Sequence, residues 1–530
     1  MRLSFFVCLL VLAGLAPGAA ARACNAGVVF EDLDADGRRD RGERVLEGIA
    51  VSDGRRIVRT DAQGRWLLPL SPDHTVFVIK PASHAFPTGT DGLPVFWRHV
   101  VRSRQPALRY GGLERQTPRC HDFALVPRAA PAREALKVLV FGDPQPKTAV
   151  DVDYYARDIV APIADAAGGA PAAELGLTLG DVVSDDLSLY PAMKRHTATL
   201  RTPWLHAAGN HDLDFDATGD ESSLDTFRRH FGPDTFAWEE PQASFIVLDD
   251  VIYQPGAAKP YIGGLREDQF TFLAAYLAGL PRDRRLVLAA HIPFFDEPGR
   301  ETFRRADRER LFELLRPFTN VLLLTAHGHV QRHHRHGPAD GWRGATPLHE
   351  YNVGAACGGY WSGLKDGQGI PDSRMSDGTP NGYASATFSA DGDYALHWHV
   401  ARGGEATMHL HAPNVLRAGA YPGVGVYANV YMGEADTRVE YRVAGGDWQP
   451  MRLSDQPDPA LRAQNLLDDA ATELRGYDRL PEAGETTHLW RGTLPTNLGP
   501  GDHLVEVRAF DRWRGEVRAS TSYRLETATP

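Results

Sequence analysis

The sequence predicts an α/β domain in the middle of a 530-residue chain, with a β-rich domain on each side. Residues 135–402 alternate apolar, strand-like runs with helical patterns, which is typical of α/β domains. Residues 24–128 and 404–530 instead contain short alternating runs separated by Gly, Pro and Asp turns. The length of the chain also suggests about three domains.

The first 23 residues are expected to be a signal peptide that is removed on export. Met1–Arg2 gives a short basic start, Ser4–Leu15 is mostly apolar, and Ala21–Ala23 fits a small-residue cleavage site. The apolar run is too short for a convincing membrane span. Cleavage would make Cys24 the first residue, so a lipid anchor there is a minor alternative. The sequence therefore predicts a periplasmic or extracellular protein without a transmembrane segment.

The charge balance argues against long nucleic acid as a partner. The chain has 68 acidic and 57 basic residues, and loss of Arg2 and Arg22 leaves 55 basic residues and a net charge of −13. Broad nucleic-acid binding needs basic patches that neutralise phosphates. Export would permit a disulfide between Cys24 and Cys120, although spacing alone does not establish a pairing. Nothing in the sequence indicates an oligomeric state.

Both flanking domains are expected to be small β-sandwiches. In the N-terminal part, strands are expected at Gly27–Phe30, Arg56–Arg59 and His74–Ile79. In the C-terminal part, Val439–Val443 and Leu504–Phe510 alternate apolar and polar residues. No internal repeat of fixed period is present.

A short linker and two clear helices are expected around the middle domain. Arg128–Ala132 is rich in Ala and Pro and indicates a linker. Leu265–Leu280 has the spacing of an amphipathic helix that Pro281 ends, and Arg305–Phe318 has similar spacing. These helices between apolar runs support the α/β assignment.

Five apolar runs of the middle domain each end in a short polar motif. The motifs are KVLVF-GDPQ, ELGLTL-GDVV, PWLHAA-GNHD, RLVLAA-HIP and NVLLLT-AHGH. Their polar residues are Asp143, Gln145, Asp181, Asn210, His211, Asp212, His291, His327 and His329. Ligands of open α/β sheets bind outside the carboxyl ends of the strands. Convergence of these ends would form a site rich in carboxylate and imidazole, and the lack of thiolates in it excludes a Cys-rich structural zinc site.

The residue types in these motifs suit two metal ions better than one. Two ions about 4 Å apart can hold the attacking and leaving oxygens of a phosphoryl transfer. Asp181 is the natural bridging carboxylate because Gly180 allows the backbone to turn tightly before it. His327 and His329 are two residues apart, so in an extended segment both rings would face the same side and could serve adjacent metals.

The five motifs resemble, in the same order, those of the calcineurin-like metallophosphoesterase family: D-x-H, G-D-x-x-D, G-N-H-D/E, H and G-H-x-H. The resemblance covers residues 136–335 with specific motifs. The flanking β domains resemble those of a bacterial exported subgroup of the family, which extends the match to nearly the whole mature chain. The resemblance implies a four-layer α-β-β-α core with flanking β-sandwich-like domains.

The resemblance also implies a dinuclear phosphoesterase that acts on a small phosphate mono- or diester. A hydroxide that bridges the metals would attack phosphorus, and His211 would protonate the leaving oxygen or stabilise charge. Asp181 would be shared by both metals. One metal would take Asp143, Gln145, Asp181 and His329, and the other Asp181, Asn210, His291 and His327. Asp212 is expected to fix the loop or orient a histidine.

Three residues depart from the family pattern. Gln145 replaces a usual His, so the first metal site is expected to be weaker or to favour Mn²⁺, Fe or Mg²⁺ over Zn²⁺. Ser184 stands where some members have an Asp that bonds the catalytic His, and Asp185 or Asp186 could substitute for it. Ala326 replaces a Gly, which is tolerated if its φ is negative. The metals therefore stay open between Mn, Fe and Zn.

A second metal motif occurs near the N-terminus. The segment Asp32–Glu43 matches a twelve-residue calcium loop, with Gly37 at the turn position. Its acidic residues are Asp32, Asp34, Asp36, Asp40 and Glu43. The flanks are not helical, so the segment resembles the calcium loops of secreted β-sandwich modules and would have a structural role. The alternative is an acidic, solvated turn beside four arginines.

Two loops after the last motif are expected to shape the substrate pocket. Asn352–Gly363 contains Tyr360 and Trp361, and Asp377–Tyr383 contains Asn381. Glycine together with aromatic residues suits a flat wall against a ring, although ordinary packing explains each residue equally well. The histidines just beyond the last motif are expected to be a solvated surface run, with contact to substrate or a third metal as the alternative. They are His333, His334 and His336.

A binding protein is the alternative to the enzyme. Gln145 and Ser184 could mark a catalytically weakened site in a carbohydrate- or cell-envelope-binding protein built on the same scaffold. The intact remainder of the metal motifs argues against this alternative.

Overall fold

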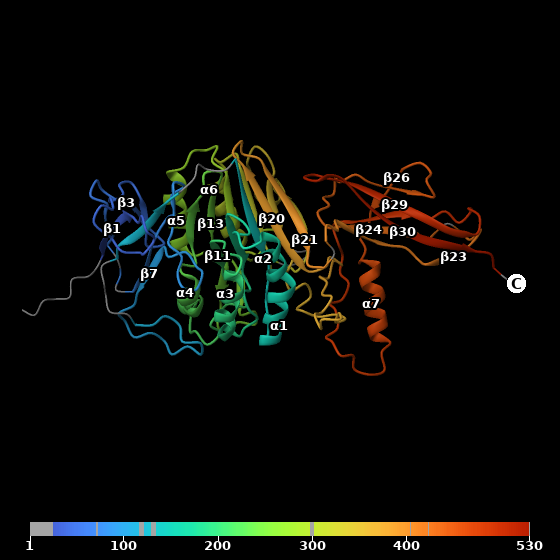
Figure 1. Ribbon diagram of the computed structural model, residues 1–530, viewed down its shortest axis with the longest axis horizontal. Coiled ribbons are helices and arrows are strands. Elements are labelled where there is room, and N and C mark those ends of the chain that lie inside the picture. The colour runs from blue at the N-terminus through green and yellow to red at the C-terminus, as the bar shows by residue number, and fades with distance from the viewer. Residues whose placement is uncertain are drawn as a thin grey trace, which may run out of the picture.

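The computed structural model describes residues 25–528 except 70, 72, 116–120, 129–133, 297–300, 403 and 422. The N-terminal β domain, the α/β domain and the C-terminal β domain follow one another along the long axis (Figure 1). The expected signal peptide, Cys24, Cys120 and most of the expected linker lie outside the described residues. Among the described residues, no helix has the length and apolar character needed to span a bilayer.

The N-terminal domain consists of two four-stranded sheets around a core that includes Trp66, Phe77 and Phe123. The strands expected in this region correspond to β1, β3 and β5. One sheet has the order β4-β1-β8-β6, formed by β1 (Ala26–Glu31), β4 (Arg65–Leu67), β6 (His84–Ala85) and β8 (Phe123–Pro127). The other has the order β3-β2-β5-β7, formed by β2 (Ala50–Ser52), β3 (Ile57–Arg59), β5 (His74–Val78) and β7 (Trp97–Val100).

The first sheet of the α/β domain has five strands in the order β11-β10-β9-β20-β21. Three parallel strands are followed in space by an antiparallel pair. They are β9 (Ala135–Phe141), β10 (Leu175–Leu179), β11 (Trp204–Ala207), β20 (Gly382–Ser389) and β21 (Tyr394–Val400). Tyr155 packs edge-on against Phe141, so the helices after β9 cover one face of this sheet. These helices are α1 (Ala149–Tyr154), the π-helix Tyr155–Val160 and α2 (Ala161–Ala167), and α3 (Tyr190–Ala198) follows β10.

The second sheet has six strands in the order β12-β13-β16-β17-β19-β18. They are β12 (Phe236–Glu239), β13 (Ser244–Val247), β16 (Leu286–Ala289), β17 (Val321–Thr325), β18 (Arg332–His336) and β19 (Leu348–Asn352). The helices of this half are α4 (Asp225–Phe231), α5 (Glu267–Ala278) and α6 (Arg305–Leu315), and a hairpin joins β14 (Val251–Tyr253) to β15 (Tyr261–Gly263). The two helices expected from sequence are α5 and α6, each a few residues shorter than predicted.

The two sheets pack face to face and give the expected four layers. Phe245 of β13 packs edge-on against Phe388 of β20, with the ring centroids 5.6 Å apart, and both sheets share one hydrophobic core. Phe312 of α6 packs on His336 of β18, so α6 covers the outer face of the second sheet. Five parallel strands (β9, β10, β11, β16 and β17) are buried on both faces, as their continuous apolar runs require.

The C-terminal domain has its own hydrophobic core and two further sheets. One contains β22 (Met408–His411), β24 (Gly425–Val430), β27 (Arg452–Leu453) and β28 (Leu489–Thr493). The other contains β23 (Val415–Arg417), β25 (Val439–Val443), β26 (Gln449–Pro450), β29 (Gly501–Asp511) and β30 (Gly515–Glu526), and α7 (Pro459–Asp469) lies beside them. Arg335 of β18 forms a two-point ion pair with Glu434, which joins this domain to the second sheet.

Candidate metal centre

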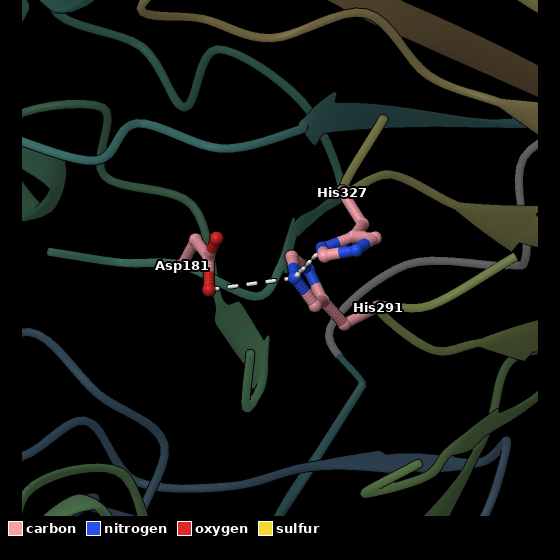
Figure 2. Close-up of side chains that lie close together, drawn as sticks. All are labelled: Asp181, His291 and His327. Atoms are coloured by element: carbon pink, nitrogen blue, oxygen red, sulfur yellow. Dashed lines mark hydrogen bonds and ion pairs between the residues drawn. The ribbon is translucent and has the colours of Figure 1, made fainter. Parts of the chain in front are cut away.

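The five polar motifs lie directly after β9, β10, β11, β16 and β17, and their side chains converge where the two sheets meet. Asp181, His291 and His327 form the middle of the group, with one ligand atom from each within 4.8 Å of the others (Figure 2). His291 Nε2 lies 3.4 Å from Asp181 Oδ1 and 3.1 Å from His327 Nδ1. Strand ends far apart in sequence therefore supply a single cluster.

The remaining predicted ligands surround this group. Asn210 Oδ1 is 3.0 Å from His291 Nε2, and His329 Nε2 is 3.6 Å from Asp143 Oδ1. Gln145 Nε2 donates to Asp181 Oδ2 at 3.2 Å. One oxygen of Asp181 thus faces His291 and the other faces Gln145, which is the arrangement expected of a carboxylate shared between two ions.

Several of the proposed ligands have a left-handed backbone. Asp143, Gln145 and Asp181 have φ of 39°, 39° and 47°, and His327 and His329 have 66° and 47°. This conformation costs a non-glycine residue about 1–2 kcal/mol, and such strain concentrates at functional sites. The expectation that His327 and His329 lie in an extended segment is therefore wrong. A tight turn aims one ring at His291 and the other at Asp143.

Two glycines allow the ligands to approach the backbone closely. A Cβ on Gly180, whose φ is +89°, would lie 2.5 Å from His291 Nδ1. A Cβ on Gly209 would lie 2.2 Å from Asp181 Oδ1. Both positions must lack a side chain for Asp181 and His291 to meet. The φ of Ala326 is not positive, so alanine can replace the family glycine at this position without backbone strain.

Backbone carbonyls fix how the histidines are presented. His291 Nδ1 is 2.8 Å from the Leu179 carbonyl oxygen, and His329 Nδ1 is 2.9 Å from that of Gly358. A ring that donates Nδ1–H to a carbonyl presents the lone pair of Nε2, which is how metal-bound histidines are usually held. Asp250 accepts from the backbone N–H groups of His291 and Ile292. Sequence reasoning missed Asp250, because no motif surrounds it.

The donor set fits metal ions. Asp143 Oδ1 and Gln145 Oε1 are buried and lack a hydrogen-bond partner among the described residues. Buried polar atoms of native proteins are nearly always satisfied, so an orphaned carboxylate oxygen and amide oxygen in one cluster indicate an additional binding partner. Burial raises the pKa of Asp143 to about 8, a cost that a bound cation would remove. The described carboxylate, amide and imidazole groups match the softness of Mn, Fe or Zn.

His211 lies at the edge of the cluster with its ring partly exposed. Its Nδ1 is 2.7 Å from Asp185 Oδ1, so Asp185 takes the place that Ser184 leaves open. Burial would lower the pKa of His211, but the hydrogen bond to Asp185 and the charge of Asp181 raise it to about 9. Asp212 accepts from the N–H groups of Gly209 and Val182 and therefore fixes the loop, as expected.

Only one of the three predicted substrate-contacting residues presents an exposed side chain. Tyr360 is 45% exposed and its ring lies 4.6 Å from that of His329. Trp361 is buried and donates to the Pro144 carbonyl, and Asn381 is buried and donates to Asp158. The expectation of a substrate wall is therefore wrong for Trp361 and Asn381, which instead support the loops behind the centre.

Two further side chains near the centre carry no sequence signal. The ring of Tyr261, in the β14–β15 hairpin, lies 6.1 Å from that of His327 and roughly perpendicular to it. Lys147 Nζ lies 5.1 Å from the centre of the Tyr360 ring. An aromatic hairpin residue and a single lysine have no recognisable pattern, so only the folded structure identifies them.

Part of the acidic loop of the N-terminal domain is arranged as a cation site would be. Asp32, Asp34 and Asp36 bring ligand atoms within 4.8 Å of one another, and Asp32 Oδ1 is buried with no hydrogen-bond partner among the described residues. Asp40 and Glu43 are outside that group. The Glu43 carboxylate accepts from the N–H groups of Leu33 and Asp40 and so closes the loop.

The histidine run after the last motif is not a solvated surface segment. His336 is fully buried, and the ring of His333 stacks on that of Tyr351 with centroids 4.5 Å apart. These residues form β18 at the edge of the second sheet, where α6 covers one face and the C-terminal domain the other. The prediction of solvation was wrong because both faces of this polar strand are covered.

Two family models match separate parts of the chain. Residues 33–110 match the N terminal of Calcineurin-like phosphoesterase, and residues 350–516 match the C terminal of Calcineurin-like phosphoesterase. The two matches cover less than half of the chain, and they support a calcineurin-like metallophosphoesterase, which is a metal-dependent phosphoester hydrolase. Among solved structures, purple acid phosphatase PPD1 from yellow lupin (Lupinus luteus) seeds is 13% identical, with 68% of each chain covered and a TM-score of 0.36. No curated protein matches the sequence.

Proposed function

We propose that this protein is an exported phosphoesterase that uses two metal ions held at the ends of β9, β10, β11, β16 and β17. The observation that carries the proposal is the position of Asp181, whose two oxygens face the two halves of the ligand cluster. Asp143, Gln145 and His329 would hold one ion with it. Asn210, His291 and His327 would hold the other.

Bound ions would polarise the phosphate ester and lower the pKa of water towards neutrality. The protein's own contribution is to present the donors without rearrangement. The left-handed turns at Asp143, Gln145 and Asp181 are already formed, and carbonyl groups already set the tautomers of His291 and His329. Gln145 offers a neutral oxygen in place of an imidazole, which favours Mn or Fe over Zn at the first position.

His211 is positioned to act on the substrate rather than on the metals. Its Nδ1 is engaged by Asp185, so Nε2 is the ring atom available to an oxygen of the substrate. In this orientation His211 would protonate the leaving oxygen or stabilise developing negative charge. Asp185 would keep the ring from rotating and would stabilise its charged form.

The surroundings of the centre favour a small phosphorylated substrate. Tyr360 and Tyr261 stand beside His329 and His327, and Lys147 adds a positive charge near Tyr360. Aromatic faces suit a ring on the leaving group, and a cation suits the phosphate. The net charge of −11 over the whole chain disfavours binding of long nucleic acid.

Two secondary proposals accompany the main one. Export rests on the signal-like residues 1–23, and mass analysis of the mature N-terminus would test it and the alternative lipid anchor at Cys24. Structural Ca²⁺ at Asp32, Asp34 and Asp36 rests on their clustering and the orphaned Asp32 oxygen. Calcium should raise the melting temperature of the wild type but not of Asp34→Asn.

The function is tested with purified protein, Mn²⁺ and a panel of aryl phosphate mono- and diesters. We expect turnover of the monoesters, the diesters or both. A binding protein on the same scaffold would instead carry two metals per chain and hydrolyse none of the panel, which would overturn the enzymatic assignment.

A further inference from the structure

A second histidine-containing cluster lies in the segment from β18 to the following 3₁₀ turn (Pro338–Asp340). His334 and His336 are two residues apart on one face of β18, and their ring centroids are 4.5 Å apart. His334 Nε2 lies 3.4 Å from Asp340 Oδ1, and His336 Nδ1 lies 4.0 Å from Asp340 Oδ2. One oxygen of the Asp340 carboxylate thus faces each ring.

The nitrogens that face Asp340 are both buried and poorly satisfied. His336 Nδ1 has no hydrogen-bond partner among the described residues, and His334 Nε2 has only its long contact with Asp340 Oδ1 at 3.4 Å. The side chain of His336 is fully buried, so water does not compensate it. Two buried imidazole nitrogens that face one carboxylate, one of them without a hydrogen-bond partner, indicate a partner shared between them.

The opposite side of the His336 ring fixes its tautomer. His336 Nε2 is 2.6 Å from Glu350 Oε2, and Glu350 is fully buried. A carboxylate has no proton to donate, so Nε2 carries the hydrogen and Nδ1 presents a lone pair in the neutral ring. A carboxylate behind a histidine is the usual arrangement of a metal-bound imidazole.

A simple ion pair explains the geometry less well. If His336 were doubly protonated, its Nδ1–H would need an acceptor. Asp340 Oδ2, at 4.0 Å, is beyond hydrogen-bond distance. A zinc ion with bonds of about 2.0–2.1 Å in a tetrahedron separates neighbouring ligand atoms by about 3.3–3.5 Å. The His334–Asp340 distance already matches that edge, and a small closure would bring His336 into range.

We propose that His334, His336 and Asp340 bind a divalent transition-metal ion of the zinc type at a site separate from the phosphoesterase centre. Two imidazoles and a carboxylate suit zinc, with the fourth position left to water. His334 and Asp340 are partly exposed, which provides a path for the ion to enter. The ion would tie the 3₁₀ turn to an edge strand and so protect that edge from unpairing.

The test counts zinc per chain in full-length protein after dialysis against a small excess of zinc. His334→Ala removes a partly exposed ligand. Asp340→Asn removes the carboxylate charge but keeps an oxygen that can accept the hydrogen bond from the Gly337 N–H. His503→Ala is the matched control, because its ring lies in the C-terminal domain and bonds only the Gly499 carbonyl in the described structure. Both test variants should carry one zinc fewer than the wild type and the control.

Thermal unfolding supplies a readout that is independent of the count. Zinc should raise the melting temperature of the Asp181→Asn protein, whose phosphoesterase centre is impaired, and should raise it less when His334→Ala is added. Glu350→Gln should weaken zinc binding about 10–100-fold, the usual cost of losing a carboxylate behind a metal-bound histidine. Equal zinc counts in the wild type, His334→Ala and Asp340→Asn would overturn the proposal.

Discussion

The phosphoesterase centre and the His334–Asp340 cluster use the same side-chain types but are assembled in opposite ways. The centre collects its donors from five strand ends between Asp143 and His329. The second cluster takes all three from seven consecutive residues. A centre built from distant segments depends on the whole fold for its geometry, whereas a local cluster depends on one strand and one turn.

Backbone conformation separates the two regions further. Donors of the centre, including Asp143, Asp181 and His327, occupy the left-handed region, while His334 and His336 belong to a β-strand. Strain of this kind persists only where the surrounding structure imposes it. On the proposed assignments, the centre is pre-formed for chemistry and the second cluster stabilises the fold. Changes at the centre should therefore abolish turnover, and changes at the cluster should spare it.

The largest effect is expected for Asp181→Asn. The substitution keeps the shape of the side chain but removes the charge shared by the two metal positions. Metal content should fall below two per chain, and turnover should drop by about 10³-fold or more, because both Lewis-acid and charge-neutralising contributions are lost. Elemental mass spectrometry measures the metal content, and an aryl phosphate assay measures the turnover. Retention of wild-type turnover would show that Asp181 is not shared.

His211→Ala should separate catalysis from metal binding. Loss of a positioned acid–base group typically costs about 10²–10⁴-fold in rate. Metal content should stay near two per chain, since His211 contacts Asp181 through its backbone N–H, which alanine retains. If the variant loses metal instead, His211 is a structural or ligating residue and its assigned role is wrong.

Asp185→Asn should have a smaller effect in the same direction. The amide can still accept a hydrogen bond from His211 Nδ1–H but no longer stabilises the charged ring, so turnover should fall about tenfold. Asp186→Asn is the matched control, because Asp186 caps the following turn rather than contacting His211. Equal turnover in the two variants would remove Asp185 from the mechanism.

Gln145→His should change metal preference more than rate. Restoring an imidazole should increase zinc retention during dialysis by about tenfold relative to manganese. Competitive loading with equal zinc and manganese, followed by metal counting, measures the ratio. An unchanged ratio would show that Gln145 Oε1 does not face a metal.

The smallest effect on turnover is expected for His334→Ala. The residue lies on β18, outside the phosphoesterase donor set, so aryl phosphate hydrolysis at room temperature should match that of the wild type. Its effect should appear as a lower melting temperature in the presence of zinc. A marked loss of turnover in a folded variant would show that the two regions are coupled.

Much of the centre could be predicted because strands and donors leave local signals. Apolar runs such as Leu175–Leu179 and Val321–Thr325 identify buried strands, and a polar residue directly after each marks the site edge. The order of the motifs then supplied the ligand assignments through resemblance to the family. The alternation of the flanking domains likewise predicted β1, β3, β5, β25 and β29 within a few residues.

The failures have a common physical cause. Trp361, Asn381 and His336 are buried by segments distant in sequence, and local polarity or aromaticity does not report such burial. Asp250 accepts from two adjacent backbone N–H groups, and these contacts depend on the turn after β16 rather than on a sequence motif. The left-handed turn at His327 and His329 also has no sequence signal beyond Gly328. Side-chain environment, rather than secondary structure, is what sequence reasoning could not supply.

The most direct test of the central claim is metal removal and restoration with turnover measured at each stage. Chelation should remove two metal ions from the phosphoesterase centre and abolish hydrolysis of an aryl phosphate, and Mn²⁺ should restore both together. Turnover that survives complete removal of metal would contradict the account, as would an inactive protein with Asp181, His291 and His327 intact and two ions bound.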